Sequence, residues 1–189
     1  KMGITVTFVS PDCTEEELNT AFQDNTRAVF GETIANPALT VLDIEKFAKA
    51  AHAHGVPLIV DNTFLSPYFQ NPLKLGADVV VHSGTKYLGG HNDTLAGFLV
   101  TGREDVSEKL RFLIKTTGAG LAPFDSWLIL RGIKTLGIRM DRAADNALEI
   151  AKWLTAQDVV TKVIYPGLPD HPGYEIMKKQ ARGFGAMLT

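Results

Sequence analysis

Residues 78–92 read DVVVHSGTKYLGGHN. The apolar run at 77–81 is short and largely β-branched, and it ends at the polar pair at 82–83. Two similar runs lie at 56–60 and 96–100, each flanked by Gly, Pro or polar residues. Continuous apolar runs that alternate with amphipathic helices are typical of a mostly parallel sheet covered by helices on both faces. This stretch therefore predicts an α/β fold.

Further strands are predicted outside this centre, to give a sheet of five to seven strands. Alternating or β-branched residues indicate a strand near the beginning of the chain, a second between the first two predicted helices, and others towards the end. These predicted strands lie at 4–9, 27–31 and 159–165, with another apolar segment after Gly185.

Helices are predicted from capping signals and from apolar spacing. Thr14 followed by Glu17 forms a capping box that predicts a helix there. A second helix is predicted to begin at Thr40 and to end at Gly55, because glycine often terminates helices. Residues 126–154 have a helical pattern with a bend expected at one of the glycines.

Composition excludes several classes of function. The 189 residues include 19 Lys and Arg against 21 Asp and Glu, so the formal charge is −2. A large basic face for nucleic acid or anionic lipid is therefore not expected, and no apolar run is long enough to span a membrane. The single cysteine, Cys13, cannot form an internal disulfide, which favours a reducing compartment. We expect a cytoplasmic protein that binds neither nucleic acid nor membrane.

Polar side chains follow three of the predicted strands, where ligands of parallel sheets bind. An acid, an amide, hydroxyl groups and a lysine suit an anionic heteroaromatic cofactor such as pyridoxal phosphate. A lysine amine can form a Schiff base with an aldehyde, a carboxylate can keep the pyridine nitrogen protonated, and hydroxyl groups can hold the phosphate. The residues concerned are Glu32, Asn36, Asp61, Asn62, Thr63, Ser83, Thr85 and Lys86.

Residues 78–92 resemble the lysine signature of the Cys/Met-metabolism family of pyridoxal-phosphate enzymes. That family includes cystathionine γ-synthase and γ-lyase, methionine γ-lyase and O-acetylhomoserine sulfhydrylase. Residues 32–37 (ETIANP), 60–64 (VDNTF) and 130–140 (LRGIKTLGIRM) agree with the family in the same order. The resemblance implies a fold-type-I large domain at 1–150 and the start of a smaller α+β C-terminal domain at 151–189.

The resemblance also implies roles for individual residues. Lys86 would carry the cofactor aldehyde and move protons on the substrate, and Asp61 would pair with the pyridine nitrogen. The remaining cofactor contacts would be Asn36 at the phenolic oxygen, Thr63 beside the ring, and Ser83 and Thr85 at the phosphate.

The implied reaction is γ-elimination or γ-replacement on a sulfur amino acid or an O-acylated homoserine. The first segments, through Asn36-Pro37 and the helix that follows, are more similar to O-acetylhomoserine sulfhydrylases, whereas 89–97 are more similar to the lyases and γ-synthases, so both alternatives stay open. The family implies a homotetramer with active sites shared between subunits.

Its members are about twice this length, so we expect a fragment lacking both ends, or else an incomplete module that folds without turnover. In a self-sufficient domain, Arg139 or Arg182 would be the first candidates to bind the substrate carboxylate.

Other sites are less well supported by the sequence. Lys86 is followed by Tyr87 and not by the Ser or Thr of a phosphate-binding loop. The glycine-rich stretch at 118–123 has proline in place of its third glycine. His52 and His54 are two positions apart on a predicted helix and should point to different sides. No metal site is predicted.

Overall fold

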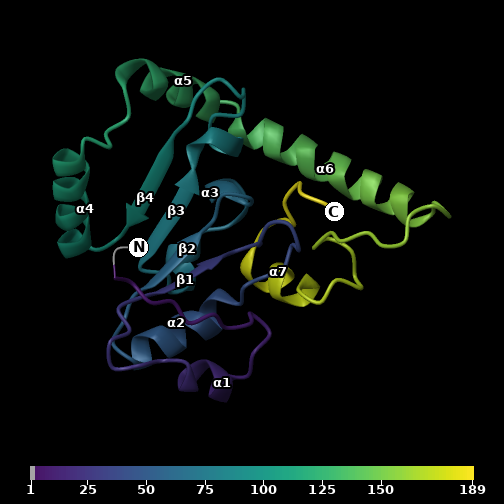
Figure 1. Ribbon diagram of the computed structural model, residues 1–189. Coiled ribbons are helices and arrows are strands. Elements are labelled where there is room, and N and C mark those ends of the chain that lie inside the picture. Colours follow the sequence, from purple (N-terminus) through teal and green to yellow (C-terminus); the bar gives the residue numbers. More distant parts are fainter. Residues whose placement is uncertain (1–2) are drawn as a thin grey trace.

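The computed structural model of the protein describes residues 3–189. A small sheet forms its centre, and helices surround the sheet (Figure 1). The elements in chain order are α1 (Glu15–Thr20), β1 (Val29–Glu32), α2 (Ile44–Ala53), β2 (Leu58–Asp61), α3 (Ser66–Phe69), the 3-10 helix η1 (Pro72–Leu75), β3 (Val79–Ser83), the π-helical turn η2 (Gly84–Leu88), β4 (Gly97–Thr101), α4 (Glu104–Thr117), α5 (Pro123–Ile133), α6 (Leu136–Thr155) and α7 (Tyr174–Gln180).

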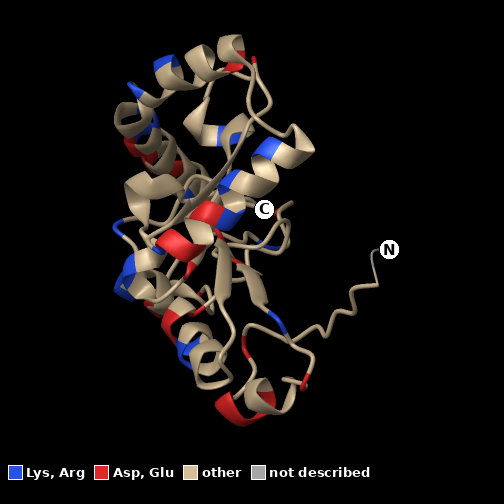
Figure 2. Cartoon of the chain, turned by 90° about the vertical axis from the view of Figure 1, so that its left-hand side faces the viewer, with Lys and Arg blue, Asp and Glu red and all other residues tan. Residues whose placement is uncertain are grey.

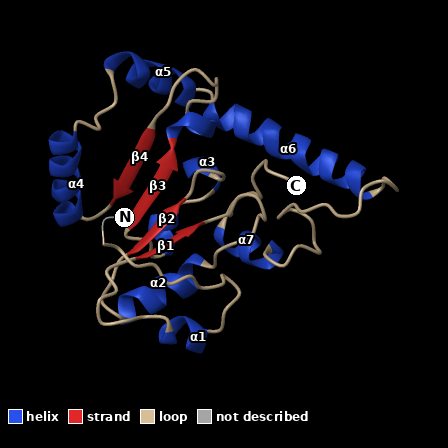
Figure 3. Cartoon of the chain, in the orientation of Figure 1, coloured by secondary structure: helices blue, strands red, loops and turns tan. Residues whose placement is uncertain are grey.

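The sheet has four strands in the order β1-β2-β3-β4. The first three strands are parallel, and β4 runs antiparallel to β3 (Figure 3). In the parallel part, Asp61 is in register with Glu32 on one side and with Val81 on the other. The predicted mostly parallel α/β sheet is therefore confirmed, and its three central apolar runs are all strands.

Helix α2 covers one face of the sheet with an apolar stripe. Ile44, Phe47 and Ala51 are buried and belong to the same core cluster as Leu58 and Val60 of β2. This spacing places the three helix residues on one side, so burial of that side against the strands holds the helix in place.

The start of α2 differs from the prediction. The Asp43 side chain accepts a hydrogen bond from the backbone N–H of Lys46 over 3.1 Å and caps the helix there. The helix therefore begins at Ile44 and not at Thr40, because the N-cap carboxylate satisfies a first-turn N–H. Its predicted end is confirmed: Gly55 follows the last turn with a φ of +70°.

The capping box of α1 is confirmed. Thr14 Oγ1 accepts from Glu17 N over 3.1 Å, and Glu17 Oε2 accepts from Thr14 N over 2.8 Å. Residues 126–154 form parts of two helices, since α5 ends at Ile133 and α6 begins at Leu136. Helix α6 continues through residue 150, so the division into 1–150 and 151–189 stays a prediction.

The predictions of strands near the two ends of the chain are wrong. Residues 4–9 form no strand, and Phe8 is 92% exposed; Figure 2 shows this segment leading away from the rest of the chain. Residues 159–165 and those after Gly185 share one pair of backbone hydrogen bonds, between Ile164 and Thr189. A strand needs a partner to satisfy its backbone groups. Without such partners the sheet has four strands instead of five to seven.

A second core cluster joins the C-terminal part to the sheet end. Met177 of α7 and Met140 of α6 are buried together with Leu65 and Leu39. Gln180 reinforces this contact, because its Nε2 donates to the carbonyl of Leu42 over 2.9 Å. The loops after β1 and β2 are thereby packed against α6 and α7.

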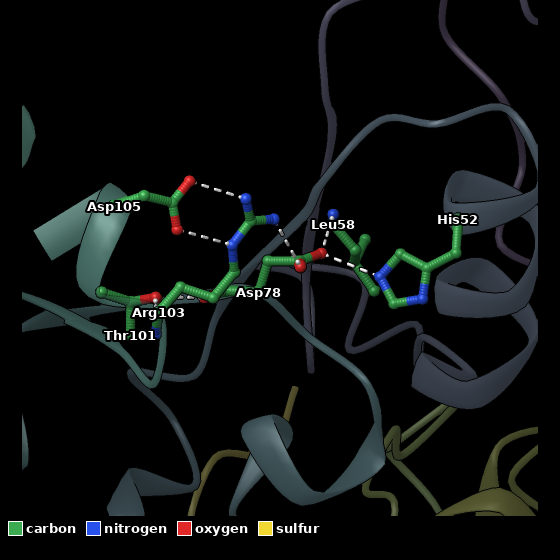
Figure 4. Close-up of polar contacts among 6 residues, drawn as sticks. All are labelled: His52, Leu58, Asp78, Thr101, Arg103 and Asp105. Carbon is green, nitrogen blue, oxygen red and sulfur yellow. Dashed lines mark hydrogen bonds and ion pairs between the residues drawn. The ribbon is translucent and has the colours of Figure 1, made fainter.

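An ion-pair cluster joins elements at the opposite end of the strands (Figure 4). Asp78, whose side chain is 13% exposed, accepts the backbone N–H of Leu58 over 2.9 Å, and His52 Nε2 lies 2.9 Å from the same oxygen. Arg103 lies 3.5 Å from the other oxygen and also pairs with Asp105 at 2.8 Å. Burial by itself would raise the pKa of Asp78, but the hydrogen bonds from His52 and Leu58 outweigh it and lower the pKa.

Candidate active site

The carboxyl ends of β1, β2 and β3 bring most of the predicted site residues to one edge of the sheet. Asp61 is the last residue of β2, and Ser83 is the last residue of β3. The turn η2 follows β3 directly and contains Thr85 and Lys86. Parallel strands place these ends side by side, so residues separated in the sequence lie within one small region.

Thr63 connects the ends of β2 and β3. Its hydroxyl donates to Asp61 Oδ1 over 2.5 Å, and its backbone N–H donates to the same oxygen over 2.9 Å. The hydroxyl oxygen also accepts the N–H of Ser83 over 2.8 Å. One side chain therefore fixes both the Asp61 carboxylate and the first residue leading into the lysine turn.

The other oxygen of Asp61 has a different environment. Oδ2 makes no hydrogen bond or ion pair with any group in residues 3–189, although the side chain is partly buried. A carboxylate in such a position can accept a proton donor from a ligand, because hydrogen bonds to a charged acceptor are strong. This geometry suits the protonated nitrogen of a pyridine ring.

Lys86 lies in the η2 turn and is exposed. Its φ and ψ of −93° and −122° interrupt the helical values of the turn. Within the described residues, its amine has no hydrogen-bond or ion-pair partner, so the amine is accessible to an aldehyde. The turn itself is closed by two backbone hydrogen bonds, from Gly89 N to Gly84 O over 2.9 Å and from Gly90 N to Lys86 O over 2.8 Å.

The predicted phosphate ligands differ in how far they are already engaged. Ser83 Oγ makes no hydrogen bond in the part of the chain that the structure describes. Thr85 Oγ1 accepts the N–H of Ala96 over 3.2 Å and donates to the Ala96 carbonyl over a long 3.4 Å. Both hydroxyl groups can therefore donate to a phosphate oxygen, Thr85 by exchanging its long bond.

Asn36 is less closely integrated with this group. It is exposed, its backbone N–H donates to Glu32 Oε2 over 3.3 Å, and its peptide bond to Pro37 is cis. Its side chain makes no hydrogen bond to the residues that the structure describes. The structure therefore places Asn36 in the loop after β1, at the same end of the sheet as Asp61, with its amide available.

Asn62, one of the candidate polar residues after the strands, has a structural role that the sequence did not predict. It is fully buried, and its Oδ1 accepts the hydroxyl of Thr33 over 3.1 Å. Its Nδ2 donates to the carbonyls of Ser66 and Gln70 over 3.1 and 3.0 Å. These bonds hold the loop that follows Asp61. A polar residue immediately after a buried strand was the available signal.

His82 lies on β3, directly before Ser83. It is 5% exposed, and its Nδ1 has no hydrogen-bond partner in residues 3–189. Burial lowers the pKa of His82, and the nearby Asp61 carboxylate opposes this only in part.

No group of three or more His, Cys, Asp or Glu residues comes together as a metal site among residues 3–189. As predicted, His52 and His54 diverge: His52 contacts Asp78, and His54 stacks on Phe22.

The residues at this edge therefore fit pyridoxal phosphate in three respects. Among residues 3–189, the Lys86 amine and one carboxylate oxygen of Asp61 have no partner, and Ser83 and Thr85 offer hydroxyl groups at the end of β3 and in the turn that follows it. An aldehyde, a pyridine nitrogen and a phosphate require this set of groups.

Comparison with known proteins agrees with this fit. A sequence model of the family described as "Cys/Met metabolism PLP-dependent enzyme" matches residues 1–189. The chain belongs to this family. The prediction from residues 78–92 that the chain belongs to the Cys/Met-metabolism family is therefore confirmed. The predicted fold class and the predicted cofactor, pyridoxal phosphate, are confirmed with it.

Individual members of the Cys/Met-metabolism family are similar over the whole chain. A cystathionine γ-lyase of Bacillus subtilis is 48% identical over 189 residues, which cover 100% of this chain and 50% of the relative. An L-methionine γ-lyase of Fusobacterium nucleatum is 50% identical over 100% of this chain and 48% of its own length. The crystal structure of a cystathionine γ-lyase from Lactobacillus plantarum complexed with L-serine has a TM-score of 0.95 and 45% identity, over 98% of this chain and 49% of that one. The chain spans about half the length of the curated relatives it matches.

Proposed function

We propose that the protein containing this chain is a pyridoxal-phosphate enzyme that catalyses γ-elimination or γ-replacement on a sulfur amino acid or an O-acylated homoserine. The observation that carries this proposal is the arrangement around Thr63, which holds Asp61 and Ser83 together beside the turn of Lys86. The names of the similar proteins, which include cystathionine and methionine lyases, support cleavage of a carbon–sulfur bond.

Each residue has a defined task in this proposal. When bound, pyridoxal phosphate supplies an electron sink for negative charge on the substrate. Asp61 Oδ2 would hold a proton at the pyridine nitrogen. Lys86 Nζ would hold the aldehyde carbon and, once the substrate amine has displaced it there, would move protons on the substrate carbons. The remaining groups bind and orient: the phosphate by Ser83 and Thr85, the phenolic oxygen by Asn36, and the ring by Thr63.

A second candidate is an O-acetylhomoserine sulfhydrylase. The first segments of the chain, through Asn36-Pro37 and the helix that follows, favour it, because they are more similar to that branch of the family. The residues assigned above serve both reactions, since each begins with removal of a proton next to the amino group. A chain limited to these residues is the further alternative, as it would keep the fold without turnover.

We further propose that the whole protein is a cytoplasmic homotetramer with active sites shared between subunits. Exposed apolar side chains on α5, namely Phe124, Trp127 and Leu130, support burial of this helix in an assembly.

Residues 1–150 are proposed as the cofactor-binding domain and 151–189 as the start of the C-terminal domain. No helix within residues 3–189 combines the length and apolar character that crossing a bilayer requires.

The test is chemical labelling of the complete polypeptide that carries this chain. Borohydride reduction in the presence of pyridoxal phosphate, followed by peptide mapping, should place the pyridoxyl group on Lys86. A label on the exposed Lys74 or Lys115 instead would contradict the assignment. Lys86→Ala should abolish turnover and leave the fold intact, whereas the control Lys115→Ala should preserve both turnover and the fold. Assays with cystathionine, methionine and O-acetylhomoserine then separate the two candidate reactions.

A further inference from the structure

The turn η2, which carries Lys86, packs against the junction of α5 and α6 (Figure 1). Gly132 of α5 packs so closely that a Cβ at this position would overlap the carbonyl oxygen of Gly89. The backbone of the helix therefore touches the backbone of the turn. Such direct contact transmits the position of α5 and α6 to the residues around Lys86.

Arg139 of α6 completes this support with three hydrogen bonds. Its Nη1 donates to the carbonyl of Tyr87 over 2.7 Å, and its Nη2 donates to the carbonyl of Gly132 over 2.9 Å. Its Nε donates to Thr135 Oγ1 over 3.0 Å. The first bond reaches the carbonyl of Tyr87, the residue that follows Lys86, while the other two anchor the guanidinium to the helix junction.

Gly90 makes room for this arrangement. Its φ is +74°, and a Cβ there would overlap the guanidinium of Arg139. The N–H of Gly90 closes the turn by donating to the carbonyl of Lys86 over 2.8 Å. The guanidinium therefore lies against the segment from Lys86 to Gly90, bonded at Tyr87 and in contact at Gly90.

Building on the proposed function, we propose that Arg139 is a positioning residue that fixes the backbone from which Lys86 projects. Three neutral oxygens hold its guanidinium, and no carboxylate pairs with it within residues 3–189. Its plane is thereby fixed against the turn instead of being offered to a ligand. These bonds favour a positioning role over the binding of a substrate carboxylate, for which Arg139 would be a candidate in a self-sufficient domain. Arg182 is engaged as well, since it bonds the carbonyl of Tyr68 and stacks on that ring.

The proposal is tested in the complete polypeptide with Arg139→Lys and Arg139→Gln. The control is Arg142→Gln, an exposed arginine on the same helix. Hydrogen exchange of residues 84–91 is measured in the cofactor-free protein, and kcat and KM are measured in the loaded enzyme. We expect faster exchange across this segment and a kcat lower by about 10- to 100-fold with KM almost unchanged, because small misplacements of a reacting group have effects of this size. The control should match the unmodified protein in every readout.

Two results would overturn the positioning role. A raised KM with unchanged kcat and exchange would show that Arg139 contacts the substrate, and unchanged values throughout would show that it does nothing for the turn. If the Arg139 variants do not fold, Thr135→Val removes one anchor and should change exchange and kcat in the same direction by a smaller factor. Labelling of the unmodified protein at Lys86 tests the proposed function separately, since the exchange comparison needs no cofactor.

Discussion

The hydroxyl oxygen of Thr63 lies 2.5 Å from Oδ1 of Asp61, and the N–H of Thr63 donates to the same oxygen over 2.9 Å. The carboxylate is therefore held by one residue through two bonds to a single oxygen. The Asp61 side chain is fixed in orientation while Oδ2 stays available. A ligand that needs one oriented carboxylate oxygen meets it without reorganisation of the site.

Asp61→Asn should therefore separate cofactor binding from cofactor activation. The amide has nearly the same shape, so we expect the cofactor to bind, although less tightly. An amide cannot hold the pyridine nitrogen protonated, so kcat should fall by about 100-fold or more, as expected when one charge-stabilising group is removed. Steady-state kinetics and the absorption spectrum of the bound cofactor measure the two effects.

Asp158→Asn provides the matched control for this experiment, because Asp158 is exposed and lies outside the site. It should leave both kcat and the spectrum unchanged. Near-normal turnover of Asp61→Asn would refute the role of Asp61 at the pyridine nitrogen.

Asn62→Ala should reduce the stability of the fold. The change leaves three buried partners without their hydrogen bonds, namely the Thr33 hydroxyl and the carbonyls of Ser66 and Gln70. Each unsatisfied buried group costs about 1–3 kcal/mol, so we expect a loss of about 3 kcal/mol or more. Urea unfolding measures it, with the exposed Asn146→Ala as the control. A loss no larger than that of the control would show that the loop after β2 does not depend on Asn62.

Asp78 should make stability depend on acid pH. Its folded pKa is lowered below the ordinary 3.8, because the hydrogen bonds from His52 and Leu58 outweigh the effect of burial. The unfolded chain then binds the proton more readily, so the contribution of Asp78 is complete above its unfolded pKa and is lost as pH falls through the folded pKa. Asp78→Asn should flatten this part of the stability profile and lower stability at neutral pH.

Thermal unfolding at a series of pH values between about 5 and 2 measures this effect. The exposed Asp12→Asn serves as a comparison. Parallel profiles for Asp78→Asn and the unmodified protein would contradict the assigned role of the Asp78 cluster.

Tyr165 should produce the opposite dependence at alkaline pH. The residue is 2% exposed and its hydroxyl donates to the carbonyl of Gly185 over 2.9 Å. Burial, with smaller effects from Tyr87 and Asp145, raises its pKa from 10.0 to about 12. The folded state therefore keeps the proton that the unfolded state loses, and stability should fall as pH rises from 10 towards 12.

Tyr165→Phe should remove this alkaline dependence. It should also cost about 1–3 kcal/mol at neutral pH, because the buried carbonyl of Gly185 loses its partner. Tyrosinate absorbance during titration identifies the late-ionising residue. The expectation fails if the variant and the unmodified protein lose stability equally above pH 10.

The central part of the fold was predictable because its signals are local. Residues 56–60, 77–81 and 96–100 are short apolar runs that can be buried only as strands beside one another. Residues 4–9 have the same local character but lack a partner strand, and pairing is a property of distant chain segments. Helix α4 was not predicted, although Val106, Leu110 and Leu113 recur at helical spacing along it. None of its residues is buried, so this apolar face has no partner within the described residues.

The site was predictable to the extent that it follows from strand ends. Asp61 and Ser83 terminate parallel strands, so the sheet places them together and brings Lys86 beside them. The position of Arg139 depends on the break between α5 and α6 and on the close approach of Gly132 to the turn. Periodicity carries no information about such an approach, so this role emerged only from the three-dimensional arrangement.

The antiparallel direction of β4 has a consequence for the order of folding. Ser83 pairs with Gly97, and the N–H of Gly84 donates to the carbonyl of Ala96 over 2.7 Å, so the turn with Lys86 lies inside a connection between adjacent strands. Contacts between segments close in sequence form faster than contacts that require long loops to close. The connection between β2 and β3 is longer and contains α3 and η1, so we expect this parallel pairing to form later. The loop that presents the lysine can therefore close before the carboxylate of Asp61 arrives beside it.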